Sequence, residues 1–186
     1  MKKFRSKLLI TFGLIGTFII IISFKTEKTH KSSNQTVKDT LSITVLQTAD
    51  IHGQLDTHPE LFWENEEIVF KNRGGLANIK TLFERERKMN PGKTLIVDGG
   101  DLIQGSGYAA LSEGKVIPDI IKNMGYDVII PGNWEVVYGK EVMLDVMKNY
   151  DTKVIAHNMH HEETGEDLFP PYWIKEIEGV RIGCRT

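Results

Sequence analysis

Short runs of β-branched residues alternate with helical patterns along most of this sequence, and this alternation constrains the fold more than any other feature. The residues predict strands at 42–47, 94–97, 127–130 and 153–156, and helices between them at about 75–88, 116–124 and 140–149. A β–α–β–α order makes the strands parallel within one sheet that carries helices on its faces. We therefore predict an α/β fold for residues 41–186.

The last segment has a different pattern. Apolar residues alternate over 172–178 and 180–184, on either side of Glu178-Gly179, a step that favours a turn. We predict an antiparallel hairpin here. The sequence stops at Thr186 with no helix or cap after this hairpin, so we expect a fold that is incomplete at its C-terminus.

The first forty residues are of a different kind. Residues 8–24 form an uncharged, apolar run of 17 residues behind four basic residues, which is typical of an export signal. Signal-peptide cores have about 7–15 apolar residues and membrane spans about 17–25, so residues 1–24 are a signal peptide or an N-terminal anchor. No small-residue cleavage site follows, which favours the anchor. Residues 25–40 lack an apolar period and are predicted to be a polar linker. We expect an exported protein, periplasmic or at the cell surface.

Composition excludes several classes of protein. A single cysteine, Cys184, cannot build a disulfide framework. Residues 1–31 hold seven basic residues and one acidic residue, which leaves a net charge of −8 for the remainder. An acidic body disfavours nucleic acid as a partner.

Polar residues follow three of the predicted strands, at the edge where parallel sheets bind ligands. Asp50 and His52 come after the first strand, Asp101 follows the second in a glycine-rich turn, and Asn133 follows the third. Each taken singly is compatible with an ordinary turn. Together they predict a metal centre, and Asp101 on the middle loop is the natural bridge between two cations. The glycine-rich turn matches neither a P-loop nor a dinucleotide-binding pattern.

The same residues carry a family resemblance. The D-x-H block at 50–52, the G-D step at 100–101 and the G-N-x-E block at 132–135 resemble the motifs of calcineurin-like metallophosphoesterases. The sequence from about 43 to 182 is similar to the branch of exported bifunctional 5′-nucleotidases and 2′,3′-cyclic phosphodiesterases. That resemblance implies a metal-dependent hydrolase of nucleotide phosphoesters with a four-layer α/β/β/α fold.

The resemblance also implies roles for the four polar residues. Asp50 and His52 would bind the first metal ion, Asp101 would bridge, and Asn133 would bind the second. Two divalent ions such as Mn²⁺ or Zn²⁺ are the implied cofactors, and a nucleotide is the implied small-molecule substrate. No catalytic or substrate-binding side chain is assigned.

Two departures from the family pattern keep other functions open. Trp134 stands where the family has a histidine beside the scissile phosphate, and it resembles the G-x-W-E block of thiosulfohydrolases. The family's downstream G-H-x-H histidines would lie beyond residue 186, so we expect a truncated enzyme. The alternatives are therefore a thiosulfohydrolase-like manganese enzyme and a non-catalytic metal-binding fragment.

Overall fold

The computed structural model describes residues 40–186. The predicted signal peptide or anchor at 1–24 and residues 25–39 of the predicted linker lie outside the described residues. Within 40–186, no helix is both long enough and apolar enough to cross a membrane.

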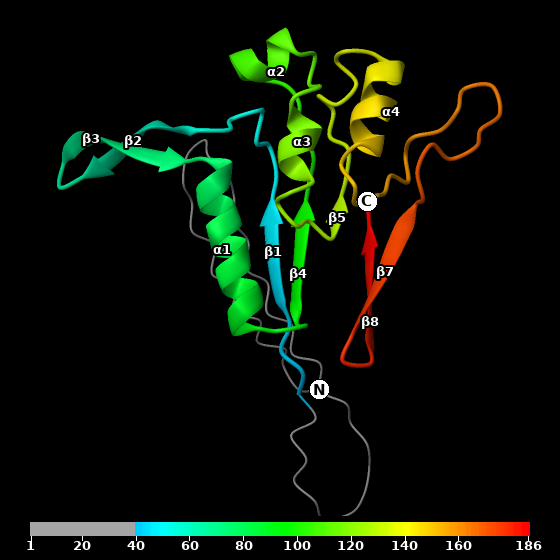
Figure 1. Cartoon of the computed structure of the whole chain (residues 1–186), viewed down its shortest axis with the longest axis horizontal. Coiled ribbons are helices and arrows are strands. Elements are labelled where there is room, and N and C mark those ends of the chain that lie inside the picture. The colour runs from blue at the N-terminus through cyan, green and yellow to red at the C-terminus, as the bar shows by residue number, and fades with distance from the viewer. Residues whose placement is uncertain (1–39) are drawn as a thin grey trace, which may run out of the picture.

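A four-stranded parallel sheet forms the centre of the fold (Figure 1). Its strands are β1 (Thr44–Thr48), β4 (Thr94–Asp98), β5 (Val128–Ile129) and β6 (Lys153–Val154), in the order β1-β4-β5-β6. In the longest pairing, Thr44 of β1 lies opposite Thr94 and Thr48 lies opposite Asp98. All four strands occur where the sequence predicts them, and the α/β class with a parallel sheet is confirmed.

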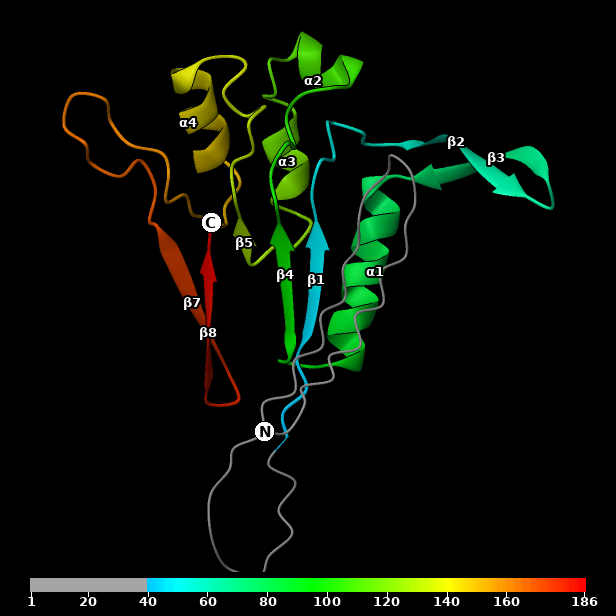
Figure 2. The same ribbon diagram turned by 180° about the vertical axis from the view of Figure 1, so that it is seen from behind.

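Helices connect the strands and cover their apolar residues. They are α1 (Leu76–Met89), α2 (Gly107–Leu111), α3 (Ile117–Ile121) and α4 (Lys140–Lys148). Leu46, Ile96 and Ile129 of the sheet are buried in one core with Phe83 of α1 and Met143 of α4. The short helix α2 lies beyond the carboxyl ends of β1 and β4 (Figures 1 and 2). This end of the sheet is the edge where the sequence predicts the site.

A long hairpin between β1 and α1 was not predicted. It consists of β2 (Thr57–Glu64) and β3 (Glu67–Gly74), which pair antiparallel and project away from the sheet (Figures 1 and 2). Asn65 and Glu66 form its turn with positive φ angles of 50° and 67°. Neither is the glycine that marks such turns in a sequence. Most of the hairpin's large apolar side chains are exposed, so no alternation of apolar and polar residues identifies the strands in the sequence.

The predicted C-terminal hairpin is present as β7 (Tyr172–Ile177) and β8 (Val180–Arg185). Glu178 and Gly179 make its turn with φ angles of 50° and 75°. Among residues 40–186 this hairpin forms a separate two-stranded sheet, on the β5 side of the parallel sheet and away from β1 (Figures 1 and 2). The Lys175 Nζ atom reaches the Asp127 Oδ1 atom at 2.5 Å and links the hairpin to the start of β5.

Candidate metal centre

Two loops run side by side at the carboxyl ends of β1 and β4. The first follows Thr48 and the second follows Asp98. Backbone N–H groups of the first loop donate to carbonyl oxygens of the second: Asp50 to Gly100 at 2.9 Å, His52 to Asp101 at 2.8 Å, and Gly53 to Leu102 at 2.8 Å. The two loops therefore have a fixed register, as adjacent strands do.

This register brings together three of the four predicted ligands. Asp50, His52 and Asp101 each present a ligand atom, and these atoms lie within 4.8 Å of one another. The His52 Nε2 atom is 3.7 Å from the Asp50 Oδ1 atom. Two carboxylates and an imidazole form a donor set suited to Mn²⁺, Zn²⁺ or similar ions. The Asp50 side chain is 69% exposed, whereas the Asp101 residue is 8% exposed, so the cluster opens to solvent on one side.

The backbone that gathers these ligands is not extended. Asp50, His52 and Asp101 have φ angles of 56°, 51° and 60°, in the left-handed region that non-glycine residues rarely adopt. The side chains at positions 50 and 52 would share one side if the strand continued, but β1 ends at Thr48. They meet because the chain turns. Backbone of this kind costs about 1–3 kcal/mol per residue and is concentrated at functional sites.

A hydrogen bond sets the orientation of the His52 ring. Its Nδ1 atom lies 3.1 Å from the carbonyl oxygen of Gln104. A carbonyl can only accept, so Nδ1 carries the proton and Nε2 keeps a free lone pair beside Asp50. The ring of Trp134 meets His52 edge-on, with centroids 6.4 Å apart and planes at 75°. The Nε2 atom of His52 is therefore the ring nitrogen that could bind a metal ion.

Asp101 is held by the loop that follows β5. Its Oδ1 atom accepts the backbone N–H of Trp134 at 2.8 Å. Gly132 lies so close that a Cβ atom there would overlap the Asp101 carboxylate. The close approach of the Asp101 carboxylate therefore requires glycine at position 132.

Glu135 also belongs to the site, although no role was predicted for it from the sequence. The residue is completely buried, and its carboxylate accepts backbone N–H groups from Asp101 at 2.8 Å, Leu102 at 2.6 Å and Gly132 at 2.6 Å. Burial raises the pKa of Glu135, while the three hydrogen bonds act in the opposite direction. The signal in the sequence is its place as the acidic residue of the G-N-x-E block. One side chain thus joins the loops after β4 and β5.

Asn133, the fourth predicted ligand, lies on this same third loop. It is exposed, and it directly precedes Trp134, whose N–H binds Asp101. The chain thus carries Asn133 to the edge occupied by the other three residues. Its role as a ligand stays a prediction.

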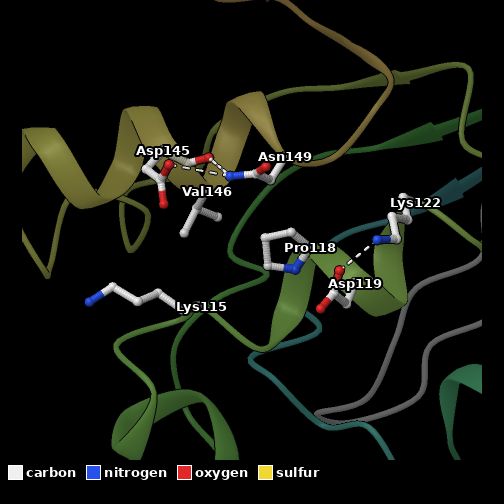
Figure 3. Close-up of a pocket in the computed structure, with 7 residues that line it drawn as sticks. All are labelled: Lys115, Pro118, Asp119, Lys122, Asp145, Val146 and Asn149. Carbon is white, nitrogen blue, oxygen red and sulfur yellow. Dashed lines mark hydrogen bonds and ion pairs between the residues drawn. The ribbon is translucent and has the colours of Figure 1, made fainter.

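A surface depression of about 250 Å³ lies between α3 and α4, apart from the candidate ligands (Figure 3). Its lining consists of Lys115, Pro118, Asp119, Lys122, Asp145, Val146 and Asn149. Lys122 pairs with Asp119 at 2.6 Å, and both side chains are exposed. None of the predicted metal ligands contributes to it.

Comparison with known proteins identifies relatives with the same architecture. Residues 43–184 match the family model described as calcineurin-like phosphoesterase. A 5′-nucleotidase of Vibrio cholerae is 29% identical over 148 residues, which cover 77% of this chain and 24% of that protein. The solved structure of the Haemophilus influenzae NAD nucleotidase is similar with a TM-score of 0.69 and 22% identity, covering 76% of this chain and 25% of that one. A 5′-nucleotidase precursor of Thermus thermophilus has a TM-score of 0.62 and 28% identity, covering 76% and 27%. The chain spans about a quarter of the length of these relatives.

Proposed function

The chain belongs to the calcineurin-like phosphoesterase family, and from that premise we propose that it provides the metal-binding loops of an enzyme that hydrolyses nucleotide phosphoesters. The observation that carries this proposal is the cluster of Asp50, His52 and Asp101 at the carboxyl ends of adjacent parallel strands. The 5′-nucleotidases among the relatives support a nucleotide as the substrate.

The proposed centre would hold two divalent metal ions. Asp50 and His52 would bind the first, Asp101 would bridge, and Asn133 would bind the second. The donor set fits, because a ring nitrogen of His52 and oxygens of two carboxylates lie within 4.8 Å of one another, and the Nδ1 bond to Gln104 leaves the lone pair on Nε2. Divalent ions bound there would supply Lewis-acid activation of water and would neutralise charge on phosphoryl oxygens.

The chain's own residues prepare this chemistry. The carbonyl of Gln104 keeps the His52 proton on Nδ1, so the ring does not have to reorient when a metal binds. Glu135 and the N–H of Trp134 fix the buried Asp101 from two directions. The side chain of Trp134 offers a single N–H donor and cannot supply a proton or a positive charge at neutral pH. The proposed reaction therefore proceeds without a general acid at this position.

Trp134 favours a second candidate substrate. Because the G-x-W-E block resembles thiosulfohydrolases and the Trp134 indole lies in a T-shaped arrangement with the His52 ring, a thiosulfate-type ester is the alternative to a nucleotide. A Trp134→His variant separates the two: it raises the rate of AMP hydrolysis if the substrate is a nucleotide. An unchanged or lower rate, together with cleavage of a thiosulfonate substrate by the wild type, favours the alternative.

We also propose that the protein is exported and that residues 1–24 direct or anchor it. The support is the apolar run at 8–24 behind a basic N-terminus. Fractionation of the host cell with an antibody to the folded domain tests this, and recovery of the full-length chain in the cytosol alone would contradict it.

The decisive experiment measures phosphate release from AMP by the full chain as Mn²⁺ is added. We expect Mn²⁺-dependent release that is lost in His52→Ala, since that change removes the only nitrogen of the donor set. His160→Ala is the matched control, because His160 is exposed and, within residues 40–186, its ring pairs with the exposed Asp167 at 2.9 Å. Mn²⁺ binding without phosphate release would favour the alternative of a non-catalytic metal-binding fragment. Equal loss in both variants would contradict the assignment of His52.

A further inference from the structure

A buried polar cluster lies directly beneath the candidate metal centre. Thr48 and Asp98 are completely buried, and Tyr126 is 7% exposed. The Thr48 hydroxyl donates to the Asp98 Oδ2 atom at 2.5 Å and lies 2.7 Å from the Tyr126 hydroxyl. These residues end β1 and β4 or precede β5, so the cluster sits at the base of the ligand loops. Its members are not metal ligands in the proposed centre.

The loop above this cluster is fixed by two buried carboxylates. The Asp98 Oδ1 atom accepts the N–H of Gly100 at 2.8 Å. The next two N–H groups along the chain, those of Asp101 and Leu102, donate to Glu135. Three successive N–H groups thus point inward to buried carboxylates.

The carbonyl groups of the same residues bind the other ligand loop. The oxygens of Gly100, Asp101 and Leu102 accept the N–H groups of Asp50, His52 and Gly53. Residues 100–102 therefore have every backbone polar group engaged, with the carboxylates on one side and the first ligand loop on the other. A shift of Gly100 would move Asp101 directly, and it would move Asp50 through the 2.9 Å hydrogen bond to the Gly100 carbonyl.

Asp98 joins both strands at once. One oxygen holds Thr48, two residues before Asp50, and the other holds Gly100, one residue before Asp101. A carboxylate at a completely buried position is costly, and an apolar residue would cost less if nothing but core packing were required. The two hydrogen bonds give this carboxylate a role that an apolar side chain cannot fill.

We propose that Asp98 is a positioning residue that holds the two ligand loops in the register required for metal binding. It touches neither metal nor substrate. This inference rests on the proposed metal centre, and it assigns to Asp98 a function beyond core packing.

The test compares Asp98→Ala with Asp98→Asn in the full chain. Asparagine retains both connections: its oxygen accepts from Gly100, and its amide donates to Thr48, whose hydroxyl then donates to Tyr126. We expect Asp98→Ala to weaken Mn²⁺ binding about 10- to 100-fold and to accelerate hydrogen exchange of the Gly100 amide at least about tenfold. Asp98→Asn is expected to stay close to wild type in both measurements.

Asp127→Ala is the matched control. The Asp127 side chain is 14% exposed and also accepts a backbone N–H, that of Ile96 at 2.8 Å, but it lies outside the ligand loops. The Asp127→Ala substitution should lower the free energy of unfolding and leave the Mn²⁺ affinity of the folded protein unchanged. Thr48→Val, which removes only the hydroxyl that Asp98 holds, replaces Asp98→Ala if the latter does not fold, and it should weaken Mn²⁺ binding in the same direction.

The outcomes are distinct. Wild-type Mn²⁺ affinity and wild-type Gly100 exchange in Asp98→Ala would overturn the proposal. Equal effects in Asp127→Ala would overturn it as well, since the effect would then be general destabilisation. If wild type itself fails to bind Mn²⁺, the metal centre is wrong, whereas faster exchange confined to residues 99–102 still supports the positioning role.

Discussion

Replacing Glu135 should destabilise the protein by an amount that follows from its hydrogen bonds. Its carboxylate accepts three backbone N–H groups within a completely buried environment. The Oε2 atom receives two of them and Oε1 receives the third. In Glu135→Gln the amide oxygen can take the place of Oε2 and keep two bonds, but the amide nitrogen then faces the N–H of Leu102, donor against donor.

The cost of that substitution can be estimated. An unsatisfied buried donor costs about 1–3 kcal/mol, and the two remaining bonds lose the strength that a charged acceptor gives them. Removing a buried charge offsets part of this loss of free energy of unfolding, because burial opposes ionisation of Glu135. We expect Glu135→Gln to lower the free energy of unfolding by about 2 kcal/mol. Glu135→Ala leaves all three donors unpaired and should cost about 5 kcal/mol, a large part of the roughly 5–15 kcal/mol that stabilises a typical domain.

Urea unfolding at pH 7, followed by tryptophan fluorescence and circular dichroism, measures both values. Glu163→Gln is the control, since Glu163 is exposed and its substitution should change stability by less than about 0.5 kcal/mol. A Glu135→Gln variant as stable as this control would refute the reasoning, because the three hydrogen bonds would then contribute nothing that an amide cannot replace.

Two further predictions concern neighbouring residues. Burial raises the pKa of Asp98 from 3.8 to about 7. Its protonated form is therefore favoured by folding, and this contribution to stability is complete below pH 3.8 and lost as pH rises to 7. Wild type should lose about 4 kcal/mol relative to Asp98→Asn between pH 4 and pH 8, measured by urea unfolding, and parallel curves would contradict the shift. Gly132→Ala should cost more than about 2 kcal/mol, because its Cβ atom meets the Asp101 carboxylate, whereas Gly107→Ala, where no atom lies within 4 Å of that Cβ, should be neutral or stabilising in thermal unfolding.

Much of the fold can be predicted from the sequence because its signals are local. The four parallel strands are short apolar runs, and α1 and α4 have apolar residues at helical spacing, so both kinds of element are visible without tertiary information. The C-terminal hairpin is visible for the same reason, since Gly179 provides the turn. The predicted ends of the helices are less accurate. The helix predicted at 116–124 is observed only at Ile117–Ile121.

The elements that the sequence analysis missed lack such signals. In the β2–β3 hairpin, Leu61, Trp63, Ile68 and Phe70 are all more than half exposed, so the usual rule that apolar residues are buried does not identify a strand there. Helix α2 has only five residues and begins at the glycine-rich stretch, where Ser106 caps it through a 3.3 Å hydrogen bond from the N–H of Ala109. A segment that short carries no measurable period.

Some features of the candidate site could likewise be predicted from the sequence, and others could not. The clustering of Asp50, His52 and Asp101 could be predicted because the sequence shows their residue types and their positions after strands, whereas their role as metal ligands stays a prediction. The role of Glu135 was not, because its partners Asp101 and Leu102 lie more than 30 residues away and only the folded chain brings them into contact. The same holds for Asp98, whose bond to Thr48 spans 50 residues.

The left-handed backbone of the three candidate ligands explains why so many buried hydrogen bonds surround them. At about 1–3 kcal/mol each, the conformations of Asp50, His52 and Asp101 would relax to extended or helical backbone if nothing opposed it. The three bonds between the loops, together with the N–H groups held by Asp98 and Glu135, oppose that relaxation. The His52 N–H binds the Asp101 carbonyl, and the Asp50 N–H binds the carbonyl of Gly100 next to Asp101, so relaxation at one of the three positions would strain the bonds that hold its neighbours. The ligand geometry therefore belongs to the folded protein itself, and metal affinity should respond to buried residues that never touch the metal.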